Sequence, residues 1–348
     1  MNIALLTIWH EGNYGAELQA YATIKILKQL GHDVRMIDIR LSDIPGMSLR
    51  GRIGCFLSSF GPSSRKFNKF WSEKFPLTRR YRSVAELKQN PPEADVYMVG
   101  SDQVWNTEIT RSFSEIYFLN FGLDTIKRVS YASSFGKESW GNYPTDTVKP
   151  LLERFQAISC RENSGVRILK ETFGVESMNV LDPTLLFDNY AELTGKIEEV
   201  PTLAYYPLDN SPELESYSES LAKRLGLKTV NANWKTYIYG SAVWDRNSIG
   251  GWIRDIAQSK FIITPSFHGL SMCLIYQRQF AVIVENKARA TRMISLLERL
   301  NLQDRVFNSF EEMEKSQPWA MPIDYNTVNE KLSKLRDKSL DFLKIALA

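Results

Sequence analysis

The sequence repeatedly places a short apolar run before a loop of small and polar residues, and this alternation favours a sheet of parallel strands covered by helices. In the first half of the chain these runs are 3–8, 34–39, 95–99, 129–132 and 157–160. Between the first two lie the loop His10 to Gly15 and a helical pattern at 16–30 that ends at Gly31. This order is a βαβ unit, the start of a doubly wound α/β sheet.

After residues 180–183 the same pattern begins again. The second half has apolar runs at 202–206, 228–231, 261–264 and 280–284, separated by helical patterns at 213–225, 249–258 and 291–300. We predict two Rossmann-like doubly wound domains, at 1–185 and 186–325. The remaining segment, 326–348, reads as an amphipathic helix that packs back on the first domain.

The length and composition support this organisation. A chain of 348 residues suits two domains of ~150 residues each. No apolar run approaches the ~18 residues that span a bilayer, and the apolar start lacks a basic leader. The cysteines Cys55, Cys160 and Cys273 are odd in number and widely separated. We therefore expect a cytoplasmic protein with neither a disulfide framework nor a metal site.

Positive charge is concentrated in one segment. The chain has a net charge of only +3, which does not indicate a nucleic-acid partner. Between Arg50 and Arg82, however, nine basic residues stand against one acid and are interleaved with aromatic residues. One interpretation is an amphipathic helical region with a solvated basic face. The other is a surface that meets an anionic membrane, at its inner face, or the diphosphate of a lipid-linked acceptor.

Ligands of open α/β sheets bind beyond the carboxyl ends of the strands. Four loops therefore matter most: 10–15, 100–106, 133–136 and 266–269, with Arg161 at the end of its own strand as a fifth contributor. They offer hydroxyls, amides, a cation and an imidazole, but no GxGxxG and no Walker lysine. The loops predict an anion site for something other than a dinucleotide or nucleoside triphosphate.

Only three histidines exist, and they differ in context. His268 stands at a strand-to-helix turn between small residues, where an imidazole could act as a general acid or base. The alternative is a buried histidine satisfied by a backbone carbonyl. His32, in a helix-ending turn, reads as structural. His10 lies in a candidate loop and is a weaker catalytic candidate.

Three other loop residues each have two interpretations. Arg161 could grip a carboxylate or phosphate, or pair with Glu162 or another acid. Asp102 could position a ligand hydroxyl or cap the following helix. Trp105 could stack on a sugar or fill the interface between the domains.

Six stretches, in order and spacing, resemble the polysaccharide pyruvyl transferase family over about residues 1–310. They are Asn13-Tyr-Gly-Ala-Glu-Leu-Gln-Ala-Tyr-Ala, Gly100-Ser-Asp-Gln-Val-Trp-Asn, Ser130-Tyr-Ala-Ser-Ser-Phe-Gly, Ile158-Ser-Cys-Arg-Glu, Leu181-Asp-Pro-Thr-Leu and Ser266-Phe-His-Gly. The resemblance implies a GT-B arrangement of two Rossmann-like domains facing a cleft. It also implies phosphoenolpyruvate as co-substrate, no other cofactor, and a pyruvate ketal on a sugar as the product.

The resemblance also implies roles for the site residues. His268 becomes the general acid/base and Arg161 the residue that binds the donor. We further expect the donor to contact Ser266, Phe267 and Gly269 of the second domain and Arg161 and Ser134 of the first. The acceptor is a sugar that is free, polymeric or linked to a polyprenyl diphosphate. We expect it to contact residues of the first domain, namely Asn13, Tyr14, Gly15, Ser101, Asp102, Gln103 and Trp105.

The sequence departs from the family around His268. Members commonly have Asp-Ser-Phe-His-Gly-Thr, whereas this chain has Pro265 and Leu270 at the outer positions, so an acid that orients His268 must come from elsewhere. Two alternatives therefore stay open. One is a glycosyltransferase of the same architecture that uses a nucleotide sugar, and the other is a non-catalytic sugar-binding homologue.

Overall fold

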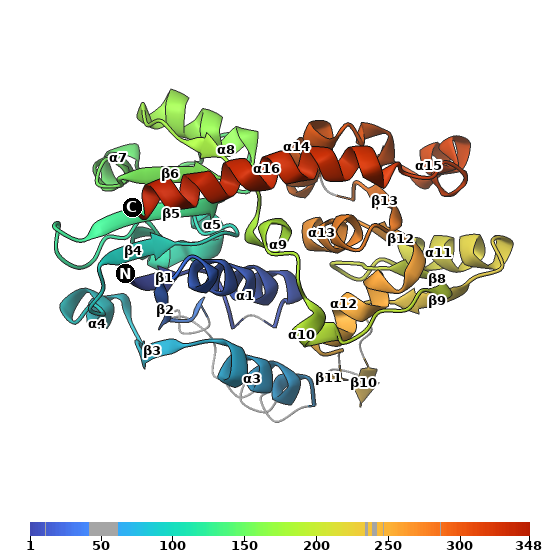
Figure 1. Ribbon diagram of the computed structural model, residues 1–348, viewed down its shortest axis with the longest axis horizontal. Coiled ribbons are helices and arrows are strands. Elements are labelled where there is room, and N and C mark those ends of the chain that lie inside the picture. Colours follow the sequence, from blue (N-terminus) through green and yellow to red (C-terminus); the bar gives the residue numbers. More distant parts are fainter. Residues whose placement is uncertain (11, 42–61, 234–235, 239–241, 246, 286) are drawn as a thin grey trace. The chain divides into compact units, whose positions relative to one another are not determined.

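The computed structural model describes residues 1–10, 12–41, 62–233, 236–238, 242–245, 247–285 and 287–348. The chain forms two compact units (Figure 1). The first comprises Met1–Met47, Ser72–Phe187 and Ser333–Ala348, and the second Ser48–Trp71 and Asp188–Leu332.

The first unit is built on a seven-stranded sheet in the order β3-β2-β1-β4-β5-β6-β7. Every pair of neighbouring strands is parallel. The strands are β1 (Asn2–Leu6), β2 (Asp33–Asp38), β3 (Leu77–Arg80), β4 (Val96–Val99), β5 (Lys127–Ser133), β6 (Ala157–Cys160) and β7 (Met178–Asn179). Parallel strands align their carboxyl ends, so the loops that follow them gather at one edge of this sheet.

Helices flank this sheet. They are α1 (Tyr14–Gln29), α4 (Val84–Gln89), α5 (Thr107–Thr110), α6 (Ser114–Tyr117), α7 (Thr145–Leu152), α8 (Asn163–Ile168) and α9 (Pro183–Leu186), with the short helical turns η2 (Arg111–Phe113) and η3 (Leu169–Phe173). Between β2 and β3 the chain also forms α3 (Pro62–Lys74). The α3 helix crosses the boundary between the two units. The central strands are apolar on both faces; all four residues of β4 are buried. This double burial is why the strands read as continuous apolar runs in the sequence.

The second unit has a five-stranded parallel sheet in the order β14-β13-β12-β8-β9. Its strands are β8 (Val200–Tyr205), β9 (Lys228–Asn231), β12 (Ser259–Thr264), β13 (Gln279–Ile283) and β14 (Val306–Phe307), and β10 (Thr236–Ile238) and β11 (Ala242–Asp245) form a separate antiparallel pair. The helices are α10 (Ala191–Thr194), α11 (Pro212–Arg224), α12 (Ile249–Ala257), α13 (Phe267–Ile275), α14 (Lys287–Leu300) and α15 (Phe310–Ser316), with turns η4 (Gln303–Arg305) and η5 (Pro318–Ala320).

The last helix, α16 (Tyr325–Ala346), returns to the first unit, as the sequence predicts (Figure 1). Its Ser339 hydroxyl accepts a hydrogen bond from the Leu181 amide at 2.9 Å, and its Arg336 donates to the Leu185 carbonyl at 2.7 Å. Phe342 packs beside Tyr131 of β5. The predicted class of two doubly wound parallel sheets, with a C-terminal helix on the first, is confirmed.

Part of the basic segment is a helix, but it also contains the edge strand β3, which the sequence analysis did not predict. Residues 50–61 lie outside the described part of the chain. In α3 and after it the aromatic side chains of Phe67, Phe70, Trp71 and Phe75 are buried. The described aromatic residues therefore serve the protein's interior, and a membrane contact by this segment stays a prediction. Among the described residues, no helix has the length and apolar character to cross a bilayer.

Candidate functional site

His268 occupies the first turn of α13, directly beyond the carboxyl end of β12. Ser266 is the N-cap, and its hydroxyl accepts a hydrogen bond from the Gly269 amide at 3.3 Å. Thr264, the last residue of β12, fixes the turn because its hydroxyl accepts from the Ser266 amide at 3.0 Å and donates to the Tyr206 carbonyl. The His268 side chain is therefore carried by a rigid strand-to-helix turn and is 9% exposed. The positive end of the α13 dipole lies in this same turn.

Gly269 has no room for a side chain. A Cβ there would lie 2.8 Å from Thr264 Oγ1 and 3.1 Å from Tyr206 Cδ1. The Thr264 hydroxyl is held by two hydrogen bonds and cannot easily give way. Gly269→Ala should therefore cost about 1–3 kcal/mol of unfolding free energy and displace His268. Gly141→Ala, at an open and exposed position, is the matched control. Equal urea midpoints for the two variants would contradict this packing argument.

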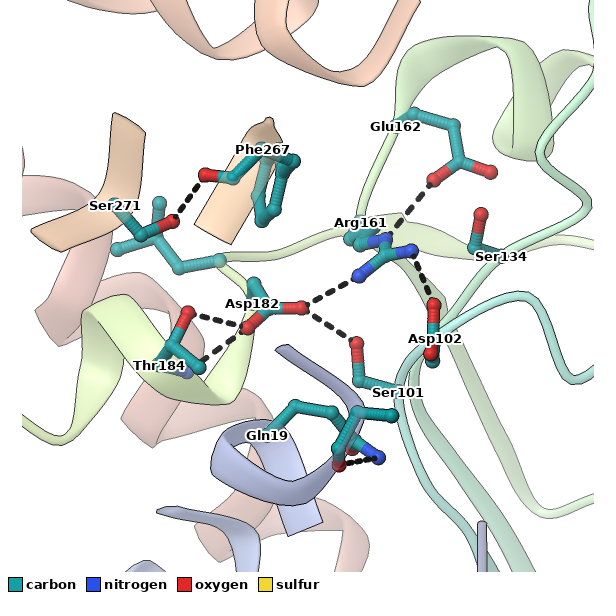
Figure 2. A network of polar contacts seen from close by, with 12 residues as sticks. Gln19, Ser101, Asp102, Ser134, Arg161, Glu162, Asp182, Thr184, Phe267 and Ser271 are labelled. Carbon is teal, nitrogen blue, oxygen red and sulfur yellow. Dashed lines mark hydrogen bonds and ion pairs between the residues drawn. The ribbon is translucent and has the colours of Figure 1, made fainter. Parts of the chain in front are cut away.

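Arg161 follows β6 and is the centre of a buried ionic cluster (Figure 2). Its Nη1 donates to Asp182 Oδ2 at 2.8 Å, and its Nη2 donates to Asp102 Oδ1 at 3.1 Å. Its Nε lies 3.8 Å from Glu162 Oε2. The side chains of Arg161, Glu162 and Asp182 have no exposed surface, whereas that of Asp102 is 16% exposed.

The acids of this cluster are themselves fixed by neighbouring elements. Asp182, the N-cap of α9, accepts from the Ser101 hydroxyl at 2.7 Å and from the Thr184 amide and hydroxyl. Glu162 Oε1 accepts from the Phe135 amide at 3.1 Å. The cluster thus ties together the carboxyl ends of β4, β5 and β6 and the start of α9, as Figure 2 shows.

This geometry gives Arg161 a structural role beside its predicted one, and donor binding by Arg161 stays a prediction. Burial disfavours the charged guanidinium, but the three carboxylates outweigh it, and the pKa of Arg161 lies above its ordinary value. One cation faces three acids, so the cluster is unfavourable for an added anion. The Arg161 side chain has no exposed surface, and its ion pair orders Asp102.

Asp102 is the part of the cluster that solvent reaches. Its backbone has a φ of +74°, a left-handed conformation that is costly for a residue other than glycine, although aspartate tolerates it better than most. Its carbonyl accepts from the amides of Val104 and Ser134. The loop and the ion pair to Arg161 together fix a strained residue, as is common at ligand sites.

The other predicted loop residues divide into exposed and buried groups. Asn13 is exposed and caps α1, because its side-chain oxygen accepts a hydrogen bond from the Gly15 amide at 2.9 Å. The Ser101 hydroxyl donates to Asp182. Tyr14 and Gly15 are buried in α1. Gln103 is half-buried, and its Oε1 accepts from Asn106 at 3.0 Å. A role for these residues in acceptor binding stays a prediction.

Two other predicted residues, Trp105 and Ser134, are buried, and their contacts lie within the first unit. Trp105 is 1% exposed, donates to the Tyr117 carbonyl at 2.9 Å and stacks on Phe118, so it belongs to the core of the first unit. Ser134 is fully buried, and its hydroxyl accepts from the Gly136 amide, so it stabilises the turn after β5.

The partners that organise this edge are not evident from sequence patterns. Asp182 belongs to the stretch Leu181-Asp-Pro-Thr-Leu. Its place before Pro183 at a helix start indicates an N-cap but does not indicate the ion pair with Arg161. Gln19 of α1 donates to the Thr7 hydroxyl at 2.9 Å, and that hydroxyl donates to the Ser101 carbonyl. Figure 2 places Gln19 below Ser101 in the same network.

His10 follows β1 and is held as a neutral imidazole. Arg40 Nη1 lies 2.6 Å from His10 Nε2, and because arginine can only donate, the ring nitrogen accepts. Burial, reinforced by Arg40 and Arg80, lowers the pKa of His10 to about 4. His10 therefore cannot supply a proton near neutral pH, which removes it as a general acid.

The same shift predicts acid sensitivity. The unfolded chain protonates His10 near its ordinary pKa of 6.5, and the folded chain only near 4, so lowering the pH from 6.5 to 4 favours unfolding. His10→Asn should reduce this loss, and asparagine tolerates the left-handed φ of +64° found at residue 10. Thermal melts of both proteins across this range check the prediction. If the melting temperatures of the two proteins fell equally between pH 6.5 and 4, the prediction would be contradicted.

The two parallel-sheet units, with polar residues gathered beyond the carboxyl ends of their strands, have the α/β architecture of the GT-B class. A family profile described as polysaccharide pyruvyl transferase matches residues 13–286. The chain therefore belongs to the polysaccharide pyruvyl transferase family and is an enzyme that transfers pyruvyl groups.

Comparison with solved structures gives the fold alone, because the sequence identities are low. An uncharacterised protein from Klebsiella pneumoniae superposes with a TM-score of 0.50 at 12% identity, covering 88% of this chain and 93% of its own. MnaA of S. aureus, solved with UDP, has a TM-score of 0.50 at 9% identity, covering 95% and 90%. Among curated proteins, no sequence matches this chain significantly.

Proposed function

We propose that this enzyme moves the pyruvyl group of phosphoenolpyruvate onto two hydroxyls of a sugar in an oligosaccharide or polysaccharide, forming a ketal and releasing phosphate. The observation that carries the proposal is the placement of His268. It is the one histidine of the chain that stands in a rigid helix N-terminal turn at the carboxyl edge of a parallel sheet.

In the proposed reaction, His268 in its protonated form delivers a proton to the methylene carbon of phosphoenolpyruvate. The cation that develops at the second carbon is attacked by one sugar hydroxyl, which loses its proton. The bond from that carbon to the phosphate oxygen then breaks, and phosphate leaves. A second sugar hydroxyl attacks the same carbon and loses its proton, closing the ketal. The helix N-terminus that carries His268 would stabilise the donor's negative charge.

The first unit would serve the acceptor. Asp102 presents an accessible carboxylate at the carboxyl edge of its sheet, and Arg161 fixes its position. A carboxylate accepts hydrogen bonds from sugar hydroxyls and can take the proton that a hydroxyl loses on attack. Arg161 is thus a positioning residue in this proposal.

A nucleotide-sugar donor is the second candidate, and one cavity favours it. A pocket of about 170 Å³ beside the His268 turn is lined by Leu208, Asp209, Pro265, Ile283, Val284, Glu285 and Met293. Its two carboxylates suit hydroxyls, such as those of a ribose, better than an anionic donor. The two candidates therefore predict different donors.

The test is phosphate release from phosphoenolpyruvate over a panel of β-galactosides and N-acetylhexosaminides, beside UDP- and CMP-sugars with the same acceptors. We expect phosphate release that depends on one acceptor class and that survives EDTA. Turnover of a nucleotide sugar, with phosphoenolpyruvate inert throughout the panel, would overturn the proposal.

A further inference from the structure

Two buried hydroxyls hold the loop that carries Asp102. The loop begins at Gly100, directly after β4, whose neighbours in the sheet are β1 and β5. Thr7, one residue beyond β1, donates through its hydroxyl to the Ser101 carbonyl at 2.9 Å. Ser133, the last residue of β5, donates through its hydroxyl to the Gly100 carbonyl at 2.9 Å. Each neighbouring strand therefore supplies a side-chain donor to a buried carbonyl just beyond the end of β4.

Ser133 is presented by an irregularity in β5. Between Ser130 and Ser133 this strand shifts its register against β6. Ala132, inside the shifted stretch, has a left-handed φ of +54°, and its amide donates to the buried Ser159 hydroxyl at 3.0 Å. A β-bulge of this kind bends the strand that contains it and is common beside active sites. Here it brings Ser133 into a parallel bridge with Asp102.

Thr7 is fixed from the side of α1. Its hydroxyl accepts from Gln19 at 2.9 Å, and Gln19 also donates to the Ile8 carbonyl. A Cβ at Gly100 would lie 3.0 Å from Thr7 Cβ, so this close approach requires glycine. Thr7 and Ser133 have no exposed surface, so water cannot replace the hydrogen bonds that their hydroxyls donate. Loss of either hydroxyl would take a donor from a buried carbonyl of the loop.

These contacts set the backbone position of Asp102. Its carbonyl accepts from the amides of Val104 at 2.8 Å and Ser134 at 3.0 Å. The carbonyls of three successive residues, 100–102, are thus each held by a different element or turn. The Asp102 side chain is 16% exposed and accepts from Arg161 through Oδ1 (Figure 2). A carboxylate that must meet a ligand hydroxyl at hydrogen-bond distance depends on this backbone, since a displacement of about 1 Å can cost 10²-fold in rate.

We propose that Thr7 and Ser133 are positioning residues for Asp102, and that their hydroxyls support acceptor activation through the backbone of residues 100–102 without contacting the acceptor. This inference rests on the proposed function, in which Asp102 takes the proton of a sugar hydroxyl. Without either hydroxyl, the strained conformation of Asp102 relaxes and its carboxylate moves from the required position. The His268 turn belongs to the other unit and shares none of these hydrogen bonds.

The kinetic test compares Thr7→Val and Ser133→Ala with Thr194→Val in the full chain. Thr194 is the matched control because its buried hydroxyl, in the second unit, donates to the Gly195 carbonyl at 2.9 Å. With the acceptor found in the panel, we expect the two first-unit variants to lower kcat/KM for the acceptor about tenfold or more. The KM for phosphoenolpyruvate should not change, and Thr7→Ser, which keeps the hydroxyl, should restore most of the rate.

A double-mutant cycle shows whether the effect passes through Asp102. Adding Thr7→Val to Asp102→Asn should lower the rate no further, because the carboxylate that Thr7 positions is already gone. An equal loss with and without that carboxylate would overturn the proposal. Wild-type kinetics in both Thr7→Val and Ser133→Ala would also overturn it. A wild-type rate in Asp102→Asn would contradict this inference together with the acceptor role of Asp102.

Hydrogen exchange reads the same positioning without turnover. The Val104 and Ser134 amides donate to the Asp102 carbonyl, so their exchange, followed by NMR, should be faster in Thr7→Val and Ser133→Ala and unchanged in Thr194→Val. Unchanged exchange in both variants would overturn the proposal even if pyruvyl transfer is observed. Faster exchange in an enzyme that transfers pyruvate to no acceptor would support the positioning and overturn the proposed function. Should Ser133→Ala lose its native circular dichroism, Thr7→Val decides.

Discussion

Arg161→Met should destabilise the protein by about 3–5 kcal/mol, the usual cost of removing one partner from a buried ion-pair cluster. The substitution keeps the length of the side chain but leaves the carboxylates of Asp102, Glu162 and Asp182 without their cation. Two of these have no exposed surface, so solvent cannot replace the lost contacts. Urea unfolding followed by circular dichroism measures the effect.

Arg167→Met is the control for this prediction. Arg167 pairs with Glu138 at 2.8 Å, but both side chains are more than half exposed, and such surface pairs contribute about 0–1 kcal/mol. Adding Asp182→Asn to Arg161→Met should recover part of the loss, since one buried charge disappears with its partner. If Arg161→Met matched Arg167→Met in stability and lost only donor affinity, Arg161 would be a ligand residue and not a buried centre.

His268→Asn should lower the rate of pyruvyl transfer by about 10²–10⁴-fold, the typical contribution of a general acid or base. Asparagine keeps a polar group in the first turn of α13 but cannot deliver a proton. The stability should change little, because the Ser266 cap and the Thr264 contacts do not involve this side chain. Initial rates at saturating donor, together with thermal melts, separate the two effects.

His32→Asn provides the comparison, since His32 follows α1 in a helix-ending turn away from the candidate loops. It should leave the rate unchanged. In a plot of the transfer rate against pH, the change caused by titration of an imidazole should be absent from His268→Asn and present in His32→Asn. Retention of near wild-type turnover by His268→Asn would remove the residue from the chemistry.

The sequence predicted most of the fold because the central strands are buried on both faces. Runs such as 96–99 are apolar throughout, and the helices between them have amphipathic patterns. Three of the missed strands lie at sheet edges: β3 reads Leu-Thr-Arg-Arg, and β7 and β14 have two residues each. The other two, β10 and β11, form the separate antiparallel pair. Edge strands need little apolar surface and therefore leave little periodic signal.

The candidate site was only partly predictable. The positions of His268, Arg161 and Asp102 at strand ends followed from local pattern. The partners of Arg161 did not, since Asp182 is 21 residues away and Asp102 is 59, and such pairings depend on how the strands are ordered in the sheet. Trp105 shows the same limit. The local sequence does not distinguish an aromatic residue that faces the core from one that faces a ligand.

The most direct test of pyruvyl transfer is the structure of the product. Wild-type enzyme, phosphoenolpyruvate labelled with ¹³C at its second carbon, and the acceptor found in the panel would be incubated and the sugar examined by NMR. We expect a labelled ketal carbon bonded to two oxygens of one sugar, and far less of it in the same time with His268→Asn. Phosphate release without a labelled sugar, or a ketal formed equally well by the variant, would contradict it.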